Sequence, residues 1–157
     1  MSSKWYWLIA IVVLAPIVLM YVLSFSAGRP TNLGVKDGKL AACPSSPNCV
    51  STQADDEGHK IEPITFTGSK ADALAKLKQA IATLPRTHIV TETADYLHVE
   101  CTSLMVRFVD DVEFWIDEAN HVIHFRSASR VGHGDLGVNR ARMETIRTAF
   151  VGGALTP

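Results

Sequence analysis

The chain has 157 residues, 47% of them hydrophobic, and its 15 Lys and Arg against 16 Asp and Glu give a formal net charge of −1. This length accommodates about one domain, and the balanced charge excludes the strong positive field with which proteins collect nucleic acid, so we expect no nucleic-acid partner. Three cysteines are too few for a disulfide scaffold and lack the paired spacing of a zinc site, so we expect neither a metal nor another cofactor.

The first element that the sequence predicts is a membrane-spanning helix. Residues 5–25 contain no charged side chain over 21 positions, and a helix of about that length crosses roughly 30 Å of hydrocarbon. Aromatic side chains, which favour the headgroup level, stand near both ends: Trp5, Tyr6, Trp7 and Tyr21. We therefore expect residues 1–26 to form a single-pass anchor with a short tail, which contacts the lipid bilayer through residues 5–25.

A cleavable signal peptide is the competing interpretation of this segment. Ser24, Phe25 and Ser26 offer small residues for cleavage. The apolar run, however, exceeds the usual signal core of about 7–15 residues, and a single Lys4 precedes it. Positive charges on the two sides of the segment are nearly balanced, so they do not decide its orientation.

Residues 27–60 are predicted to form a linker. Within it, Cys43 and Cys49 enclose two prolines and an asparagine, which favour a tight turn that brings the thiols within bridging distance. Two free thiols in an ordered loop are the alternative. A disulfide would place the domain in an oxidising compartment, so we expect it on the extracytoplasmic side of the membrane.

The folded domain is expected over residues 61–152, and it begins with a short strand and a helix. Pro63 places the strand at a sheet edge, because proline cannot donate a hydrogen bond to its neighbour. Ser69 and Asp72 resemble a capping box at the start of the helix, and Pro85 ends it. Between them, apolar residues recur at helical spacing: Leu74, Leu77, Ile81 and Leu84.

Four strand candidates follow, at about residues 88–92, 95–103, 106–117 and 121–129. Apolar and polar residues alternate along them, which is typical of an antiparallel sheet with one buried and one polar face. A last helix is expected over about residues 136–151, with Asp135 as its N-cap. The predicted fold class is therefore α+β: a transmembrane helix followed by a β-α-β-β-β-β-α domain, in which two helices pack on one face of an antiparallel sheet.

Three stretches of the chain together resemble one protein family. They are residues 43–50 (Cys-Pro-Ser-Ser-Pro-Asn-Cys-Val), residues 107–114 (Arg-Phe-Val-Asp-Asp-Val-Glu-Phe), and residues 126–140, from Arg-Ser-Ala-Ser-Arg-Val-Gly to Asp-Leu-Gly-Val-Asn-Arg. Over about residues 40–150 the chain is similar to members of domain-of-unknown-function family 1499. The resemblance implies no activity, but it makes these stretches the candidates for whatever the family does.

The third stretch is the candidate ligand site. A glycine turn before a helix N-terminus suits a small anion, and nearby arginines supply charge-assisted hydrogen bonds. Internal pairing is the alternative, with Asp135 capping the helix and Arg126 paired across the sheet. A Gly-His-Gly-Asp-Leu-Gly match to the dinucleotide fingerprint follows a strand that is polar on alternate residues, and too few residues follow it for the second strand, helix and acidic residue that would support it. The ligand-binding candidates are Arg126, Ser129, Arg130, Gly132, His133, Asn139 and Arg140.

Asp110, Asp111 and Glu113 form an acidic cluster on one predicted strand. Because neighbours on a strand point to opposite faces, Asp110 and Asp111 cannot face one ligand. Asp110 is then directed toward the core, where it needs a partner, and Arg130 or a backbone cap is the candidate. We assign no catalytic residue.

The leading hypothesis is a membrane-anchored, non-catalytic interaction domain, an accessory component of a membrane complex whose partner is a membrane protein. A small-anion or lipid-headgroup binding module is one alternative, and a hydrolase-like enzyme that uses Asp111, Glu113 and His133 is another. A cleft on the polar sheet face lined by His98, Glu113 and Arg126 would favour an alternative. Paired charges on a flat face would favour the leading hypothesis.

Overall fold

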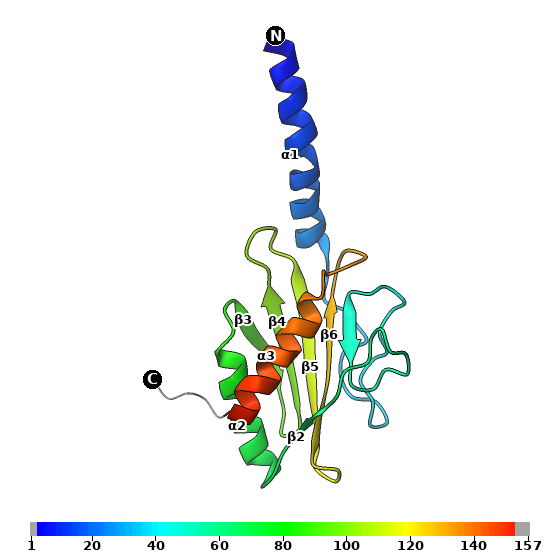
Figure 1. The fold of residues 1–157 in the computed structure, drawn as a ribbon, viewed down its shortest axis with the longest axis vertical. Helices are drawn as coiled ribbons and strands as arrows, with labels where there is room; N and C mark the ends of the chain where they lie inside the picture. The colour runs from blue at the N-terminus through cyan, green and yellow to red at the C-terminus, as the bar shows by residue number, and fades with distance from the viewer. Residues whose placement is uncertain (1–2, 153–157) are drawn as a thin grey trace.

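A long apolar helix stands on a small α+β domain in the computed structural model, which describes residues 3–152 (Figure 1). The helix, α1 (Ser3–Ser26), is long and apolar enough to cross a membrane by length and composition, properties that a signal sequence shares. The remaining elements within residues 3–152 are β1 (Cys49–Ser51), β2 (Ile64–Thr65), α2 (Lys70–Ala82), β3 (Thr87–Glu92), β4 (Tyr96–Thr102), β5 (Val109–Asp117), β6 (Val122–Ser129) and α3 (Val138–Gly152).

All six of these strands join one antiparallel sheet in the order β1-β6-β5-β4-β3, and β2 also pairs with β6. Helices α2 and α3 pack on the same face of the sheet (Figure 1). The predicted α+β class, with an antiparallel sheet and two helices on one face, is confirmed. One strand differs from the expectation: β1 comes from residues 27–60, the segment predicted as linker.

The helix-facing side of the sheet forms the hydrophobic core. Strand β5 contributes Val112, Phe114 and Ile116, whose alternation predicted the strand. The other core side chains come from neighbouring strands and from both helices: Leu97, Val99, Ile123, Phe125, Leu77, Ile81, Met143, Ile146 and Phe150. The predicted cap of α2 is also present, because the Ser69 side chain accepts a hydrogen bond from the Asp72 backbone N–H at 3.1 Å.

The segment between α1 and β1 crosses the opposite, polar face of the sheet. Arg29 forms an ion pair with Glu100 of β4 at 2.7 Å, and the Gly34 N–H donates to Glu113 of β5 at 2.7 Å. A Cβ atom at Gly38 would lie only 3.4 Å from the Trp115 ring. We refer to residues 29–38 as the covering segment, because it is part of the fold and not a free tether.

Helix α1 ends against the loop between β4 and β5. Tyr21 OH donates to the Met105 carbonyl oxygen, and the buried Ser24 side chain donates to the Arg107 carbonyl oxygen at 2.6 Å. These contacts join residues more than eighty positions apart in the sequence. They fix the end of α1 to one end of the sheet.

The predicted disulfide between Cys43 and Cys49 is confirmed. The two Cα atoms lie 5.7 Å apart, and the bridge closes the proline-rich turn immediately before β1. Cys101 is the free cysteine of the described residues, and burial raises the pKa of its thiol to about 11. It packs in the core, as its place among the apolar residues of β4 predicts.

Candidate functional site

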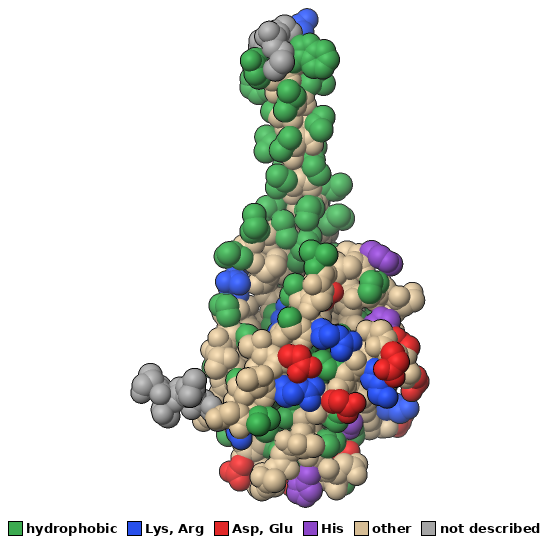
Figure 2. Space-filling model, viewed as in Figure 1, with side chains coloured by type: hydrophobic (Ala, Val, Ile, Leu, Met, Phe, Trp, Pro, Cys, Tyr) green, Lys and Arg blue, Asp and Glu red, His purple; other side chains and the backbone are tan. Residues whose placement is uncertain are grey.

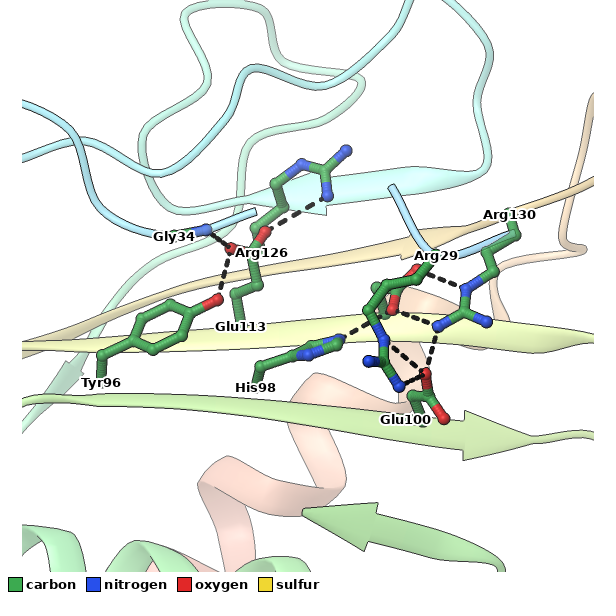
Figure 3. Close-up of polar contacts among 9 residues, drawn as sticks. Arg29, Gly34, Tyr96, His98, Glu100, Glu113, Arg126 and Arg130 are labelled. Carbon is green, nitrogen blue, oxygen red and sulfur yellow. Dashed lines mark hydrogen bonds and ion pairs between the residues drawn. The ribbon is translucent and has the colours of Figure 1, made fainter. Parts of the chain in front are cut away.

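A group of ionisable side chains lies on the polar face of the sheet, beneath the covering segment. Residues opposite each other on antiparallel strands share a face, so the register of β4, β5 and β6 places these side chains in adjacent rows. The group has two halves, one around Asp111 and one around Glu113. Figure 3 draws the polar contacts of both halves, with Arg130 and Glu100 in the first and Tyr96 in the second. We call it the charge cluster, and it consists of Tyr96, His98, Glu100, Asp111, Glu113, Arg126 and Arg130.

Arg130 holds the first half of the charge cluster together. Its Nε and Nη2 atoms donate to the two carboxylate oxygens of Asp111, each at 2.8 Å, and Nη2 also donates to Glu100 at 2.5 Å. Planar, bidentate contacts of this kind are the strong form of ion pair. His98 Nε2 lies 2.8 Å from Asp111 Oδ1, and Arg29 of the covering segment binds Glu100 from outside.

These contacts set the charge states of the two carboxylates. Burial alone would raise the pKa of Asp111, but hydrogen bonds from Arg130 and His98 outweigh it and lower that pKa. Burial is likewise outweighed at Glu100, where Arg130 and Arg29 lower the pKa. The hydrogen bonds to Asp111 raise the pKa of Arg130 above its ordinary value. Asp111, Glu100 and Arg130 are therefore ionised at neutral pH.

Glu113 is the centre of the second half and is fully buried. Its Oε1 atom accepts hydrogen bonds from Tyr96 OH at 2.8 Å and from the Gly34 N–H at 2.7 Å. Burial and the Glu113 charge raise the pKa of Tyr96, so the phenol remains a donor. Arg126 Nη1 reaches Oε2 at a longer 3.5 Å, and the buried Nε of Arg126 has no hydrogen-bond partner among the described residues.

Asp110 lies on the helix-facing side of the sheet, apart from Asp111 and Glu113, as the alternation predicts. The predicted partner, Arg130 or a backbone cap, was wrong. Arg142 of α3 donates to Asp110 at 2.5 Å, whereas Arg130 follows β6 on the polar side and binds Asp111. The acidic cluster of the sequence is thus divided between two separate networks.

Asn139 organises the network on the helix-facing side. Its side-chain oxygen accepts from Ser127 at 2.6 Å and from Arg142 at 2.7 Å. Its amide nitrogen donates to the Asn48 carbonyl at 3.0 Å and to the Ser129 hydroxyl at 3.1 Å. A fully buried amide with all these partners ties α3 to β6 and to the loop before β1. The predicted ligand-binding residues Asn139 and Ser129 are therefore hydrogen-bonded to each other.

Two more of the predicted ligand-binding residues contact the backbone of surrounding loops. The Gly132 carbonyl accepts a hydrogen bond from the Asn48 side chain at 2.6 Å. Arg140 donates to the carbonyl oxygens of Gly58 at 3.0 Å and Lys60 at 2.9 Å. The arginines of the candidate set are thus directed at different parts of the protein, and anion binding by the set stays a prediction.

Asp135 caps α3, although the helix begins later than predicted. Its carboxylate accepts hydrogen bonds from the backbone N–H groups of Gly137 at 3.0 Å and Asn139 at 2.8 Å. Leu136 and Gly137 have φ angles of 55° and 78°. These left-handed conformations do not continue into a helix, so α3 starts at Val138 and not at residue 136.

The chemistry open to the charge cluster is limited by its internal pairing. Ligand atoms of His98, Glu100 and Asp111 lie within 4.8 Å of one another, a grouping that suits a metal ion by residue type. Arg130 already neutralises both carboxylates, and a metal ion would have to displace it. Within residues 3–152, no hydroxyl or thiol hydrogen-bonds to His98 as a nucleophile would. His133, from the proposed hydrolase set, is exposed in the turn before α3.

Sequence reasoning named His98 as a residue of a possible cleft on the polar sheet face but did not assign Tyr96 or Glu100 to a site, although all three occupy the polar positions of β4. Their alternation opposite Asp111 and Glu113 was the available signal. The contributions of Arg29 and Gly34 had no signal in the sequence, because loop residues carry no periodicity that predicts which strand they cross.

Comparison with known proteins identifies one match. A family model described as "Protein of unknown function (DUF1499)" matches residues 39–150, most of the domain that carries the charge cluster. This confirms the resemblance inferred from the three stretches of sequence. No curated protein and no solved structure matches the chain.

Proposed function

The chain belongs to the DUF1499 family, and we propose that it is a single-pass membrane protein whose domain serves as a non-catalytic interaction module of a membrane complex. The observation that carries this proposal is the junction between α1 and the domain. Tyr21 and Ser24 fasten the end of the apolar helix to the β4–β5 loop. The helix therefore holds the domain at a fixed position, close to the surface of any membrane that it enters.

The exposure of α1 supports its role as an anchor. Only 6% of the apolar stretch of this helix is buried inside the protein. An exposed apolar surface of this extent is unfavourable in water. The backbone of an α-helix forms its hydrogen bonds within the helix, which a lipid environment requires. The Cys43–Cys49 disulfide supports an extracytoplasmic place for the domain, because structural disulfides persist in oxidising compartments.

The pairing within the charge cluster supports an interaction role over an enzymatic one. His98, Glu113 and Arg126 are each at most 7% exposed, so little of their surface is open to a substrate. The three carboxylates of the cluster face three guanidinium groups, counting Arg29. An enzyme of the hydrolase type needs at least one such group free to meet substrate. In this chain they stabilise the fold and hold the covering segment in place.

Native electrophoresis of membranes that contain the full-length chain tests the interaction role. After a carbonate wash and solubilisation in mild detergent, we expect the chain to migrate in an assembly larger than the purified chain forms alone. As a matched control that keeps Tyr21 and Ser24, residues 5–20 are replaced with an unrelated apolar helix of equal length. The assembly should persist in this control, because the domain makes the contact. Migration identical to that of the purified chain would contradict the proposal.

Arg126 favours a second candidate function, the binding of a small anion or lipid headgroup. Its Nε is buried without a hydrogen-bond partner in residues 3–152 and its ion pair with Glu113 is long, so the guanidinium retains donors for another acceptor. Phosphate that binds there would raise the melting temperature of the wild-type chain but not that of Arg126→Met. Arg140→Met is the control that should leave the response to phosphate unchanged. If phosphate does not stabilise the wild type, this candidate fails.

A further inference from the structure

We propose that the end of the domain nearest α1 rests on the bilayer itself, with the loop of residues 103–108 and the turn of residues 131–137 in contact with lipid. This inference rests on the proposed function, because it requires that α1 spans a membrane. It adds a second membrane contact, made by the folded domain, and fixes which end of the domain faces the lipid.

Both segments leave the sheet at the end where α1 arrives. The last residue of β4, Thr102, pairs with Val109 at the start of β5, so the connecting loop projects from this end. The last residue of β6, Ser129, pairs with Asp110 beside it. The turn that follows β6 therefore emerges next to the β4–β5 loop, and Figure 1 shows both at the end of the sheet where α1 arrives.

The depth of the β4–β5 loop follows from its contact with α1. Tyr21 hydrogen-bonds to the Met105 carbonyl, and the apolar run of α1 continues beyond Tyr21 to Phe25. Four residues of helix correspond to about 6 Å. Met105 therefore lies about one helical turn inside the end of the apolar run. When Phe25 is at the level of the lipid headgroups, the loop is at least at the same depth.

The side chains at this end suit such a position. Leu104 and Met105 are 70% and 78% exposed, and Leu136 and Val138 are exposed in the turn and at the start of α3. Outside α1, the other large apolar side chain that is exposed in residues 3–152 is Val151, at the far end of α3. Figure 2 shows apolar side chains continuing from α1 onto the top of the domain.

Leu136 is the most informative of these residues. It has a φ of 55°, in the left-handed region that a side chain with a Cβ adopts at a cost, and its side chain is fully exposed. No packing within the domain offsets this cost. Contact with lipid would offset this cost, because burial in an apolar phase stabilises an exposed leucine side chain.

Arg107 adds the charge expected beside a membrane surface. It stands in the β4–β5 loop with an exposed side chain that forms no ion pair among the described residues. Cations at this level interact with lipid phosphates. Segments that bind at a membrane interface combine exposed apolar side chains with nearby cations. This end of the domain has both.

Fluorescence quenching by spin-labelled lipids tests the proposal in the full-length chain reconstituted in phosphatidylcholine vesicles. Single cysteines are introduced by Leu104→Cys, Leu136→Cys, Val151→Cys and Val13→Cys and labelled with an environment-sensitive fluorophore. Cys101 is buried and the other two cysteines are bridged, so the native chain contributes little labelling. Val151 is as exposed as Leu104 but lies at the opposite end of the domain, so it controls for the apolar character of the label.

Nitroxides near the headgroups should quench the labels at positions 104 and 136, because these positions lie at the lipid interface, and leave the label at position 151 unchanged. Nitroxides deep in the acyl chains should quench the label at position 13. Quenching at position 13 without quenching at 104 and 136 would overturn this inference while the anchor stands. Absence of quenching at position 13 would overturn both. Protection of positions 104 and 136 in native membranes but not in vesicles would assign this surface to a protein partner and overturn the lipid contact.

Discussion

Replacing Arg130 with methionine should destabilise the domain by about 3–5 kcal/mol, because it leaves a buried carboxylate without its cation. The Asp111 side chain is 1% exposed and loses two hydrogen bonds, and Glu100 loses a third. Methionine keeps an apolar stem of similar length, so little packing is lost. At roughly 3–5 °C per kcal/mol for a domain of this size, the melting temperature should fall by about 10–25 °C.

The assay is thermal unfolding of the full-length chain in detergent, followed by circular dichroism. Arg29→Met is the matched control, because it removes a guanidinium from the same carboxylate, Glu100, but from a side chain that is 50% exposed. Exposed ion pairs contribute about 0–1 kcal/mol. A loss at Arg130 no larger than the loss at Arg29 would refute the buried, paired arrangement.

The difference in stability between the wild type and Arg130→Met should also depend on pH, with a definite sign. In the wild type the pKa of Asp111 is lowered, so the stability that its carboxylate contributes is present above the ordinary carboxyl pKa and is lost as pH falls through the lowered value. Without Arg130, burial is no longer outweighed and that pKa should rise. Protonation then relieves the buried charge. The difference in stability between wild type and variant should therefore shrink as pH falls from 7 toward about 4, and a constant difference would contradict this reasoning.

Three further predictions concern the disulfide and the start of α3. Thiol labelling of the denatured, non-reduced protein should modify Cys101 alone, and labelling of all three cysteines would contradict the bridge. Asp135→Ala should cost about 0.5–2 kcal/mol in the free energy of unfolding, because two backbone N–H groups lose their acceptor; an unchanged melting temperature would argue against the cap. Asn139→Ala should cost at least about 2 kcal/mol, because several buried partners are left unpaired; a smaller loss than at Asp135 would contradict its central place in the network.

The parts of the fold that follow from local pattern were predictable. Alternation along β5 separates Asp110 from Asp111 and Glu113, and the structure places them on opposite faces for that reason. Helical spacing identified Leu77 and Ile81 as core residues of α2. Strand β1 was missed because three residues are too few to show alternation.

The parts that depend on tertiary packing were not predictable. The covering segment meets the sheet through Arg29 and Gly34, whose partners are 71 and 79 positions away, and no local pattern encodes that path. Asp110 pairs with Arg142 and not with Arg130 because α3 lies on one face of the sheet while residue 130 turns to the other. Assigning the partner of a buried carboxylate requires the relative placement of the elements, which periodicity does not supply.

The central claim, that α1 is retained as a membrane anchor for the domain, is tested most directly by mass spectrometry of carbonate-washed membranes. We expect the chain to stay in the membrane fraction and to yield an N-terminal peptide that still contains Lys4. Recovery of the domain in the soluble fraction, as a form that begins near Ala27, would contradict it and identify α1 as a cleaved signal sequence.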